Sequence, residues 1–65
     1  MATQFAIQDG GTFYVFEDET YDGEVDTKLV DIINSPYEVD DHDLFMAGKA
    51  REWFTTNFPN IPLEG

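Results

Sequence analysis

The sequence predicts a small α+β fold, in which an antiparallel sheet packs against an amphipathic helix near the carboxy terminus. Three observations lead to this prediction. The turn-forming residues "DGG" at 9–11 separate two segments that are typical of strands. An amphipathic pattern with helical periodicity covers residues 41–57. The 65 residues are 42% hydrophobic and 15% aromatic, which is enough for one packed domain over residues 1–65.

The first two strands are predicted to form a hairpin over residues 3–17. In "TQFAIQ" at 3–8, polar and apolar residues alternate, and Phe5 and Ile7 share one face. The glycines that follow tolerate the positive φ angles of a tight primed turn. Only β-branched and aromatic residues occur in "TFYVF" at 12–16, which indicates a strand with apolar side chains on both faces.

The middle of the chain is predicted to contain an acidic loop and a short helix. The stretch "EDETYDGEVD" at 17–26 is predicted to form the loop, in which Gly23 can adopt a conformation that other residues avoid. Residues 27–34 are ambiguous, because their β-branched content permits a third strand. We favour the helix, since Asp26 could cap it, Ser35 and Pro36 would end it, and one helical face would carry Val25, Leu29, Ile32 and Ile33.

The carboxy-terminal helix is predicted to begin at a cap formed by Asp40. Asp43 would then occupy the N3 position of an imperfect capping box, and Val39 and Leu44 would form a hydrophobic staple. A helical wheel places the apolar residues on one half and Phe45 on the polar half. The apolar half consists of Leu44, Met46, Ala47, Ala50, Trp53 and Phe54. The core is expected to contain Phe5, Phe13, Val15, Trp53 and Phe54.

Several kinds of chemical site are disfavoured by the composition. The chain has no cysteine, so it has no disulfide framework and no thiolate metal site. One histidine and one serine leave little for nucleophilic catalysis, and we expect no enzymatic activity. The segment that starts at Asp18 partly matches an EF-hand loop, but Leu29 stands where a bidentate glutamate is needed. Adjacent side chains of "DDHD" at 40–43 diverge on a helix, so we expect neither a metal nor a cofactor.

The acidic residues are concentrated in the middle of the chain. Fourteen acidic residues against three basic ones give a formal net charge of −11. Eleven of the acids and only one base, Lys28, lie between Glu17 and Asp43. Like-charge repulsion on this scale opposes folding of a small domain. The clustering therefore indicates a functional surface.

This acidic surface has three possible origins. Solubility alone needs a net charge of only about −2 to −8, and adaptation to high salt would distribute acids over the whole chain, whereas the first 16 residues contain one. Mimicry of nucleic-acid phosphates accounts for both the charge and its clustering, because duplex DNA carries one negative charge per ~1.7 Å of axis. The alternative from another class is an acidic adaptor that binds its partner through shape and aromatic contacts.

The predicted site is a single negative face that binds the lysines and arginines of a DNA-binding protein. Direct nucleic-acid or membrane binding is not expected, and we favour a monomer. The amino terminus lacks the features of a signal peptide and no segment is long and apolar enough to span a membrane, so we expect a soluble, cytoplasmic protein. Tyr21 is the candidate aromatic anchor. The acidic members of the face are Glu17, Asp18, Glu19, Asp22, Glu24, Asp26, Asp40, Asp41 and Asp43.

The chain resembles a known class of phage protein. Its length, lack of cysteine, aromatic core and acidic clusters such as "EDETYDGEVD" and "EVDDHD" are similar to those of small acidic anti-CRISPR proteins that block type I surveillance complexes. The resemblance implies a DNA-mimicking inhibitor that occupies the PAM-reading surface of a Cascade complex in the host cytoplasm. Such a protein excludes target DNA without cutting anything.

Overall fold

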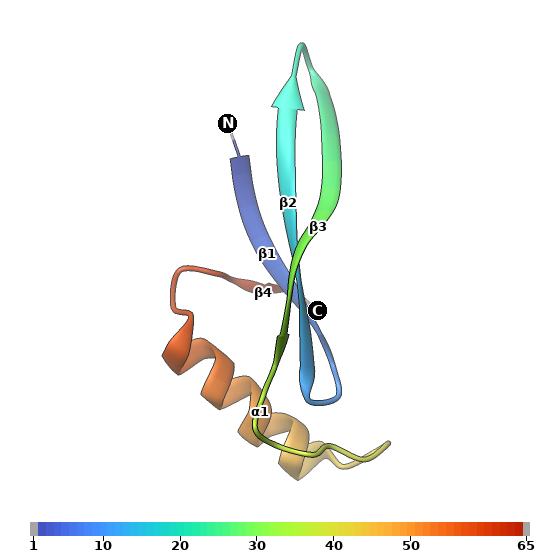
Figure 1. Cartoon of the computed structure of the whole chain (residues 1–65), viewed down its shortest axis with the longest axis vertical. Coiled ribbons are helices and arrows are strands. Elements are labelled where there is room, and N and C mark those ends of the chain that lie inside the picture. The colour runs from blue at the N-terminus through green and yellow to red at the C-terminus, as the bar shows by residue number, and fades with distance from the viewer. Residues whose placement is uncertain (1, 65) are drawn as a thin grey trace.

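The computed structural model describes residues 2–64 and shows an α+β fold, with one helix and a four-stranded mixed sheet (Figure 1). The strand order is β3-β2-β1-β4. Strand β2 pairs antiparallel with both β1 and β3, whereas β4 pairs parallel with β1. The predicted α+β class, amino-terminal hairpin and carboxy-terminal helix are confirmed. The elements are β1 (Ala2–Asp9), β2 (Thr12–Tyr21), β3 (Glu24–Asn34), α1 (Leu44–Asn57) and β4 (Leu63–Glu64).

The turn between β1 and β2 consists of Gly10 and Gly11, as "DGG" predicts. Gly10 has a φ angle of 62°, in the region that favours glycine. Gly11 is required for a different reason, because a Cβ atom there would lie 2.5 Å from the backbone oxygen of Tyr37. This close approach fixes the connection between β3 and α1 against the hairpin turn.

The predicted acidic loop and middle helix are wrong. Strand β2 continues to Tyr21, and β3 begins at Glu24 after a two-residue turn. The turn residues Asp22 and Gly23 have φ angles of 49° and 83°, both positive as a type I′ turn requires. Residues 27–34 pair with β2 throughout, so the strand alternative is correct. A helix there would leave the backbone edge of β2 without a partner, which pairing with β3 avoids.

Strand β3 contains a β-bulge near its middle. Val15 pairs with Asp31 and Phe16 pairs with Leu29, so Val30 is the additional residue. The bulge allows Leu29 and Ile32, which are three residues apart, to lie on the same face of the sheet.

The helix begins later than predicted. Its N-cap is Asp43, whose Oδ1 accepts a hydrogen bond of 3.1 Å from the backbone nitrogen of Met46. Asp40 is not the cap, because a turn with the positive φ angle of His42 (67°) precedes the helix. Leu44 is 84% exposed, so it belongs neither to the core nor to a hydrophobic staple. Phe45 is 72% exposed, as the helical wheel predicts.

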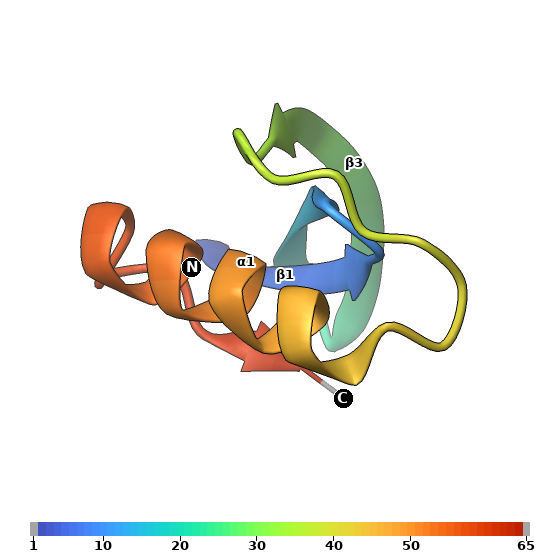
Figure 2. The same ribbon diagram turned by 90° about the horizontal axis from the view of Figure 1, so that it is seen from below.

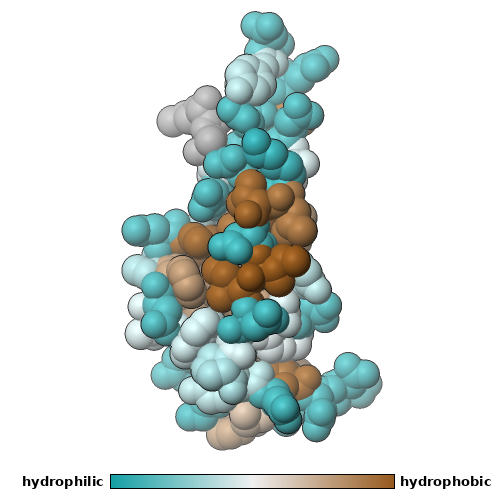
Figure 3. Space-filling model, in the orientation of Figure 1, coloured by the Kyte–Doolittle hydropathy of each residue, from teal (hydrophilic) through white to brown (hydrophobic). Residues whose placement is uncertain are grey.

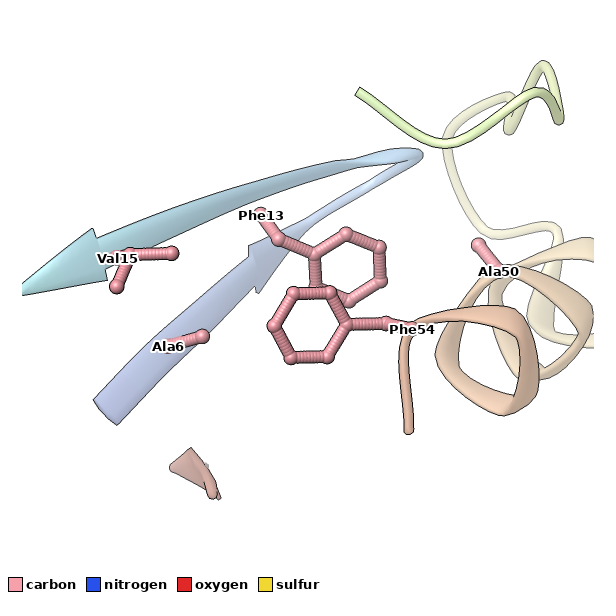
Figure 4. Packing of buried hydrophobic residues seen from close by; sticks show 5 residues of the cluster. All are labelled: Ala6, Phe13, Val15, Ala50 and Phe54. Carbon is pink, nitrogen blue, oxygen red and sulfur yellow. The ribbon is translucent and has the colours of Figure 1, made fainter. Parts of the chain in front are cut away.

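The core lies between the helix and one face of the sheet (Figure 4). Its fully buried members come from β1, β2 and α1, and Trp53 packs partly buried against them. Phe5 is not part of this core. It lies on the opposite face of the sheet, where its ring stacks on Phe16. The buried residues are Ala6, Phe13, Val15, Ala50 and Phe54.

The two faces of the sheet are therefore different. We call the face that packs against α1 the inner face and the opposite one the outer face. Gln8 on the inner face donates a hydrogen bond of 2.9 Å to the backbone oxygen of Ala47 in the helix. Figure 2 shows the helix running across β1, while β3 lies farther from it.

The far end of the β2–β3 hairpin extends well beyond the helix (Figure 1), and its surface is mostly hydrophilic (Figure 3). The molecule measures 42 × 21 × 16 Å, with a radius of gyration of 13.1 Å. A compact domain of 65 residues would have a radius of about 11 Å. We call residues 17–28, which form this extension, the acidic arm.

Candidate protein-binding surface on the acidic arm

The acidic arm brings together seven of the ten predicted site residues. Because side chains alternate along a strand, its carboxylates divide between the two faces. Asp18 lies on the outer face and Asp22 in the turn. The inner face carries the larger share, together with Tyr21. Its carboxylates are Glu17, Glu19, Glu24 and Asp26.

Like charges lie directly opposite each other on the inner face of the arm. Glu19 pairs with Asp26 across the two strands, and such juxtaposed carboxylates are destabilising. The only base of the arm is Lys28, whose Nζ lies 3.9 Å from Oε2 of Glu17 and 3.9 Å from Oε2 of Glu19. Its side chain is 60% exposed, so water screens both ion pairs. The arm keeps a formal charge of −5.

Hydroxyl groups orient two of the carboxylates. The phenol of Tyr21 donates a hydrogen bond of 2.5 Å to Oε1 of Glu19. This bond, and the negative charge of Glu19, raise the pKa of Tyr21 above its usual value of 10.0. On the outer face, the hydroxyl of Thr27 donates to Oδ1 of Asp18. These contacts leave the remaining carboxylate lone pairs available to external donors.

The other three predicted residues lie at the opposite end of the molecule. Asp40, Asp41 and Asp43 line an open groove of about 400 Å³ together with the β1–β2 turn. The arm tip follows the other end of β2, so the length of this strand separates the two acidic groups. The expectation of one negative face is therefore wrong. Asp43 is also engaged as the helix cap.

Sequence reasoning missed one carboxylate on the same face as the arm. Asp31 pairs with Val15, which places it on the inner face between the arm and the helix. Its Oδ1 accepts a hydrogen bond of 2.8 Å from the backbone nitrogen of Ile32. Only the assignment of residues 27–34 to a strand could have revealed its position.

Other kinds of site find little support among residues 2–64. This part of the chain contains no group of three or more histidine, aspartate or glutamate residues placed to hold a metal ion. The segment with the partial EF-hand match forms two paired strands rather than a loop between helices. A second open groove, of about 200 Å³, is lined by Trp53 and Lys49. No helix within the described residues is long and apolar enough to cross a membrane.

Comparisons with protein-family models, with curated proteins and with solved structures give no match for this chain. The geometry and charge of the arm are therefore the features of this chain that indicate a function.

Proposed function

We propose that the protein is a non-enzymatic inhibitor whose acidic arm takes the place of a DNA strand in a basic groove of a nucleic-acid-binding protein. The observation that carries this proposal is the spacing of carboxylates along the arm. The inner face carries its four carboxylates between the Glu17–Lys28 pair and the Tyr21–Glu24 pair. These two pairs are four residues apart along β2, which is about 13 Å at roughly 3.3 Å per residue. Four carboxylates over this length are close to one per 3.4 Å, the axial spacing of phosphates in one strand of duplex DNA.

The carboxylate spacing of the arm matches one strand of DNA rather than a whole duplex. The entire acidic set would have imitated both strands over about half a helical turn, but Asp40, Asp41 and Asp43 lie at the far end of the molecule. A paired hairpin is also stiffer than a loop. It can therefore present charges to lysines and arginines without a large loss of conformational entropy on binding.

The energetic cost of the arm supports a functional origin. Glu19 and Asp26 repel each other across the strands, and the arm contributes no buried residue to the core. A hairpin that served only the fold would gain stability from opposite charges at these positions. Attraction to a basic partner would offset the repulsion and accelerate association.

The resemblance to acidic anti-CRISPR proteins suggests the partner. Within this proposal the arm enters the PAM-reading surface of a type I Cascade complex in the cytoplasm of the host cell. Arginine and lysine side chains of that surface would pair with carboxylates of the inner face instead of DNA phosphates. The protein binds no nucleic acid itself and catalyses no reaction.

The test is capture of partners on the immobilised protein, with and without excess duplex DNA. A mimic releases its partner when DNA is added and when the salt concentration is raised. An acidic adaptor, the alternative favoured by exposed Leu44 and Phe45, keeps its partner in the presence of DNA. Retention under excess DNA would therefore contradict mimicry. Folding only above roughly 1 M salt would instead support high-salt adaptation.

A further inference from the structure

The outer face of the sheet is apolar at its centre and has no element packed on it among the described residues. Two adjacent rows of side chains, each running across β1, β2 and β3, form this centre. Ile7, Leu29 and Ile32 are 43%, 48% and 49% exposed. Antiparallel sheets that face water normally carry polar residues on that side. The rows are Ile7, Tyr14 and Ile32, and Phe5, Phe16 and Leu29.

Polar rows border this apolar centre on both sides. Each polar row contains one carboxylate and two uncharged residues that can form hydrogen bonds. Along the strands the rows are therefore polar, apolar, apolar and polar. A rotation that exchanges the two ends of the face leaves this order unchanged. The polar rows are Asp9, Thr12 and Asn34 at one end, and Thr3, Asp18 and Thr27 at the other.

In place of the monomer favoured from sequence alone, we propose that this outer face binds the outer face of a second copy of the chain, forming a two-fold symmetric dimer. A symmetric interface requires a surface that is complementary to itself, and the exchange symmetry of the rows supplies one. When the two-fold axis runs across the strands, the row of Ile7 on one copy packs on the row of Phe5 on its partner. Sheets in face-to-face contact lie about 10 Å apart, a distance that interdigitated side chains of this size fill.

The charge distribution selects this orientation of the dimer. Each copy has a net charge of −11, much of it on the arm. An axis along the strands would place the two arms beside each other. An axis across the strands points them in opposite directions, so the most acidic parts of the copies lie farthest apart. The inner face of each arm, which carries most of its carboxylates, also remains free for a partner.

The extent of the face is sufficient for an interface of modest affinity. Four rows about 7 Å apart on three strands about 4.8 Å apart cover roughly 400 Å² in projection. The accessible area of such a side-chain surface exceeds its projection, and the smaller stable interfaces bury about 600 Å² on each partner. We therefore expect dissociation in the micromolar range.

A second copy would also supply burial that the monomer lacks. Only five hydrophobic residues of the described chain are fully buried. The accessible surface of the chain is 4771 Å², whereas a compact monomer of 7.4 kDa would expose about 4200 Å². Small domains commonly gain the missing stability through oligomerisation. A second copy is present whenever the chain folds at sufficient concentration. A foreign partner is not always present.

Sedimentation equilibrium of the full chain tests the proposal. At roughly 100 μM protein and about 0.5 M salt, where repulsion is screened, we expect twice the mass of 7.4 kDa. The variant Ile7→Thr/Leu29→Thr/Ile32→Thr should raise the dissociation constant by about 100-fold or more. Threonine suits strands, and the three side chains are already half-exposed, so the fold should persist. Fluorescence of Trp53, which lies on the other side of the sheet, reports whether it does.

The matched control removes apolar side chains from the helix instead. Leu44→Thr/Phe45→Thr deletes the two most exposed large hydrophobic residues and should leave the dimer intact. A monomeric wild-type chain, a dimer unaffected by the sheet variant, or a dimer lost in the helix variant would each overturn the proposal. If the triple variant unfolds, Leu29→Lys provides the same test with one substitution, because a charge buried at the interface disfavours association. Loss of partner binding by the arm would leave this result unchanged.

Discussion

Phe13 and Phe54 stack with their ring centroids 4.3 Å apart and their planes inclined by 17°. Phe13 comes from the central strand β2 and Phe54 from the helix, and both side chains are fully buried. Phe58 extends the stack, with its ring centroid 5.2 Å from that of Phe54. This contact joins the sheet to the helix, so it should dominate the stability of the fold.

Replacing Phe54 by alanine should therefore lower the free energy of unfolding by about 3–5 kcal/mol. A core of this size supplies only about 3–5 kcal/mol of stability in all. The variant should therefore be largely unfolded. Urea denaturation followed by circular dichroism measures the effect. Phe45→Ala is the control on the same helix, and it should cost less than about 1 kcal/mol, most of it from the lost contact with Lys49. Equal losses for the two variants would contradict the assigned core.

Replacement by alanine at two glycines should change the free energy of unfolding in opposite directions. At Gly11 the added Cβ would lie 2.5 Å from the backbone oxygen of Tyr37, so the hairpin turn or the segment after β3 must shift. Gly48 lies in the helix with no heavy atom within 4 Å of such a Cβ. Gly48→Ala should raise the free energy of unfolding by up to about 1 kcal/mol, and Gly11→Ala should lower it. Thermal melts of both variants compare the signs.

Lys28 should weaken binding of a basic partner, because it is the one positive charge on the arm. Lys28→Gln removes its ion pairs with Glu17 and Glu19, at a cost in stability of about 0.2–1 kcal/mol. The association rate with a basic partner should rise severalfold at low salt, and the difference should fade as salt is added. A slower association would show that the partner does not respond to the charge of the arm.

The hydrogen bond between Tyr21 and Glu19 should be lost at high pH. Because the pKa of Tyr21 is raised above 10.0 by this bond and by the charge of Glu19, the bond contributes fully below pH 10 and is lost as the pH rises through the raised value. Ultraviolet titration of the tyrosines should show one group with a late transition. Glu19→Gln should move that transition to lower pH, and Tyr21→Phe should remove it.

Local sequence features predicted the parts of the fold that depend on local structure. The glycines after Asp9 specified the first turn, and the periodicity up to Asn57 specified the helix. The faces of the first strand were assigned wrongly, because Phe5 and Ile7 are the larger apolar residues. The structure instead buries Ala6, whose small side chain admits the aromatic rings of Phe13 and Phe54 against the sheet.

The site was predicted only in part for a similar reason. The charges of residues 17–26 are evident from composition, but the local sequence predicts a loop at Asp22 and Gly23 rather than a type I′ turn. The apolar spacing of residues 29–33 fits a helix because the bulge at Val30 breaks strand alternation. Because β3 was not predicted as a strand, neither the arm nor its distance from Asp40 could be inferred.

The most direct test of the proposed function uses two variants with equal charge. Glu19→Gln/Glu24→Gln/Asp26→Asn neutralises the inner face of the arm, whereas Asp40→Asn/Asp41→Asn/Glu52→Gln removes three charges from residues outside it. Each variant has a formal net charge of −8, three units above the wild-type value of −11. The measurement is displacement of labelled target duplex from a purified type I Cascade complex. We predict that wild-type protein and the second variant displace the DNA, and that the arm variant requires at least about tenfold more protein. Equal displacement by both variants, or none by the wild type, would contradict the account.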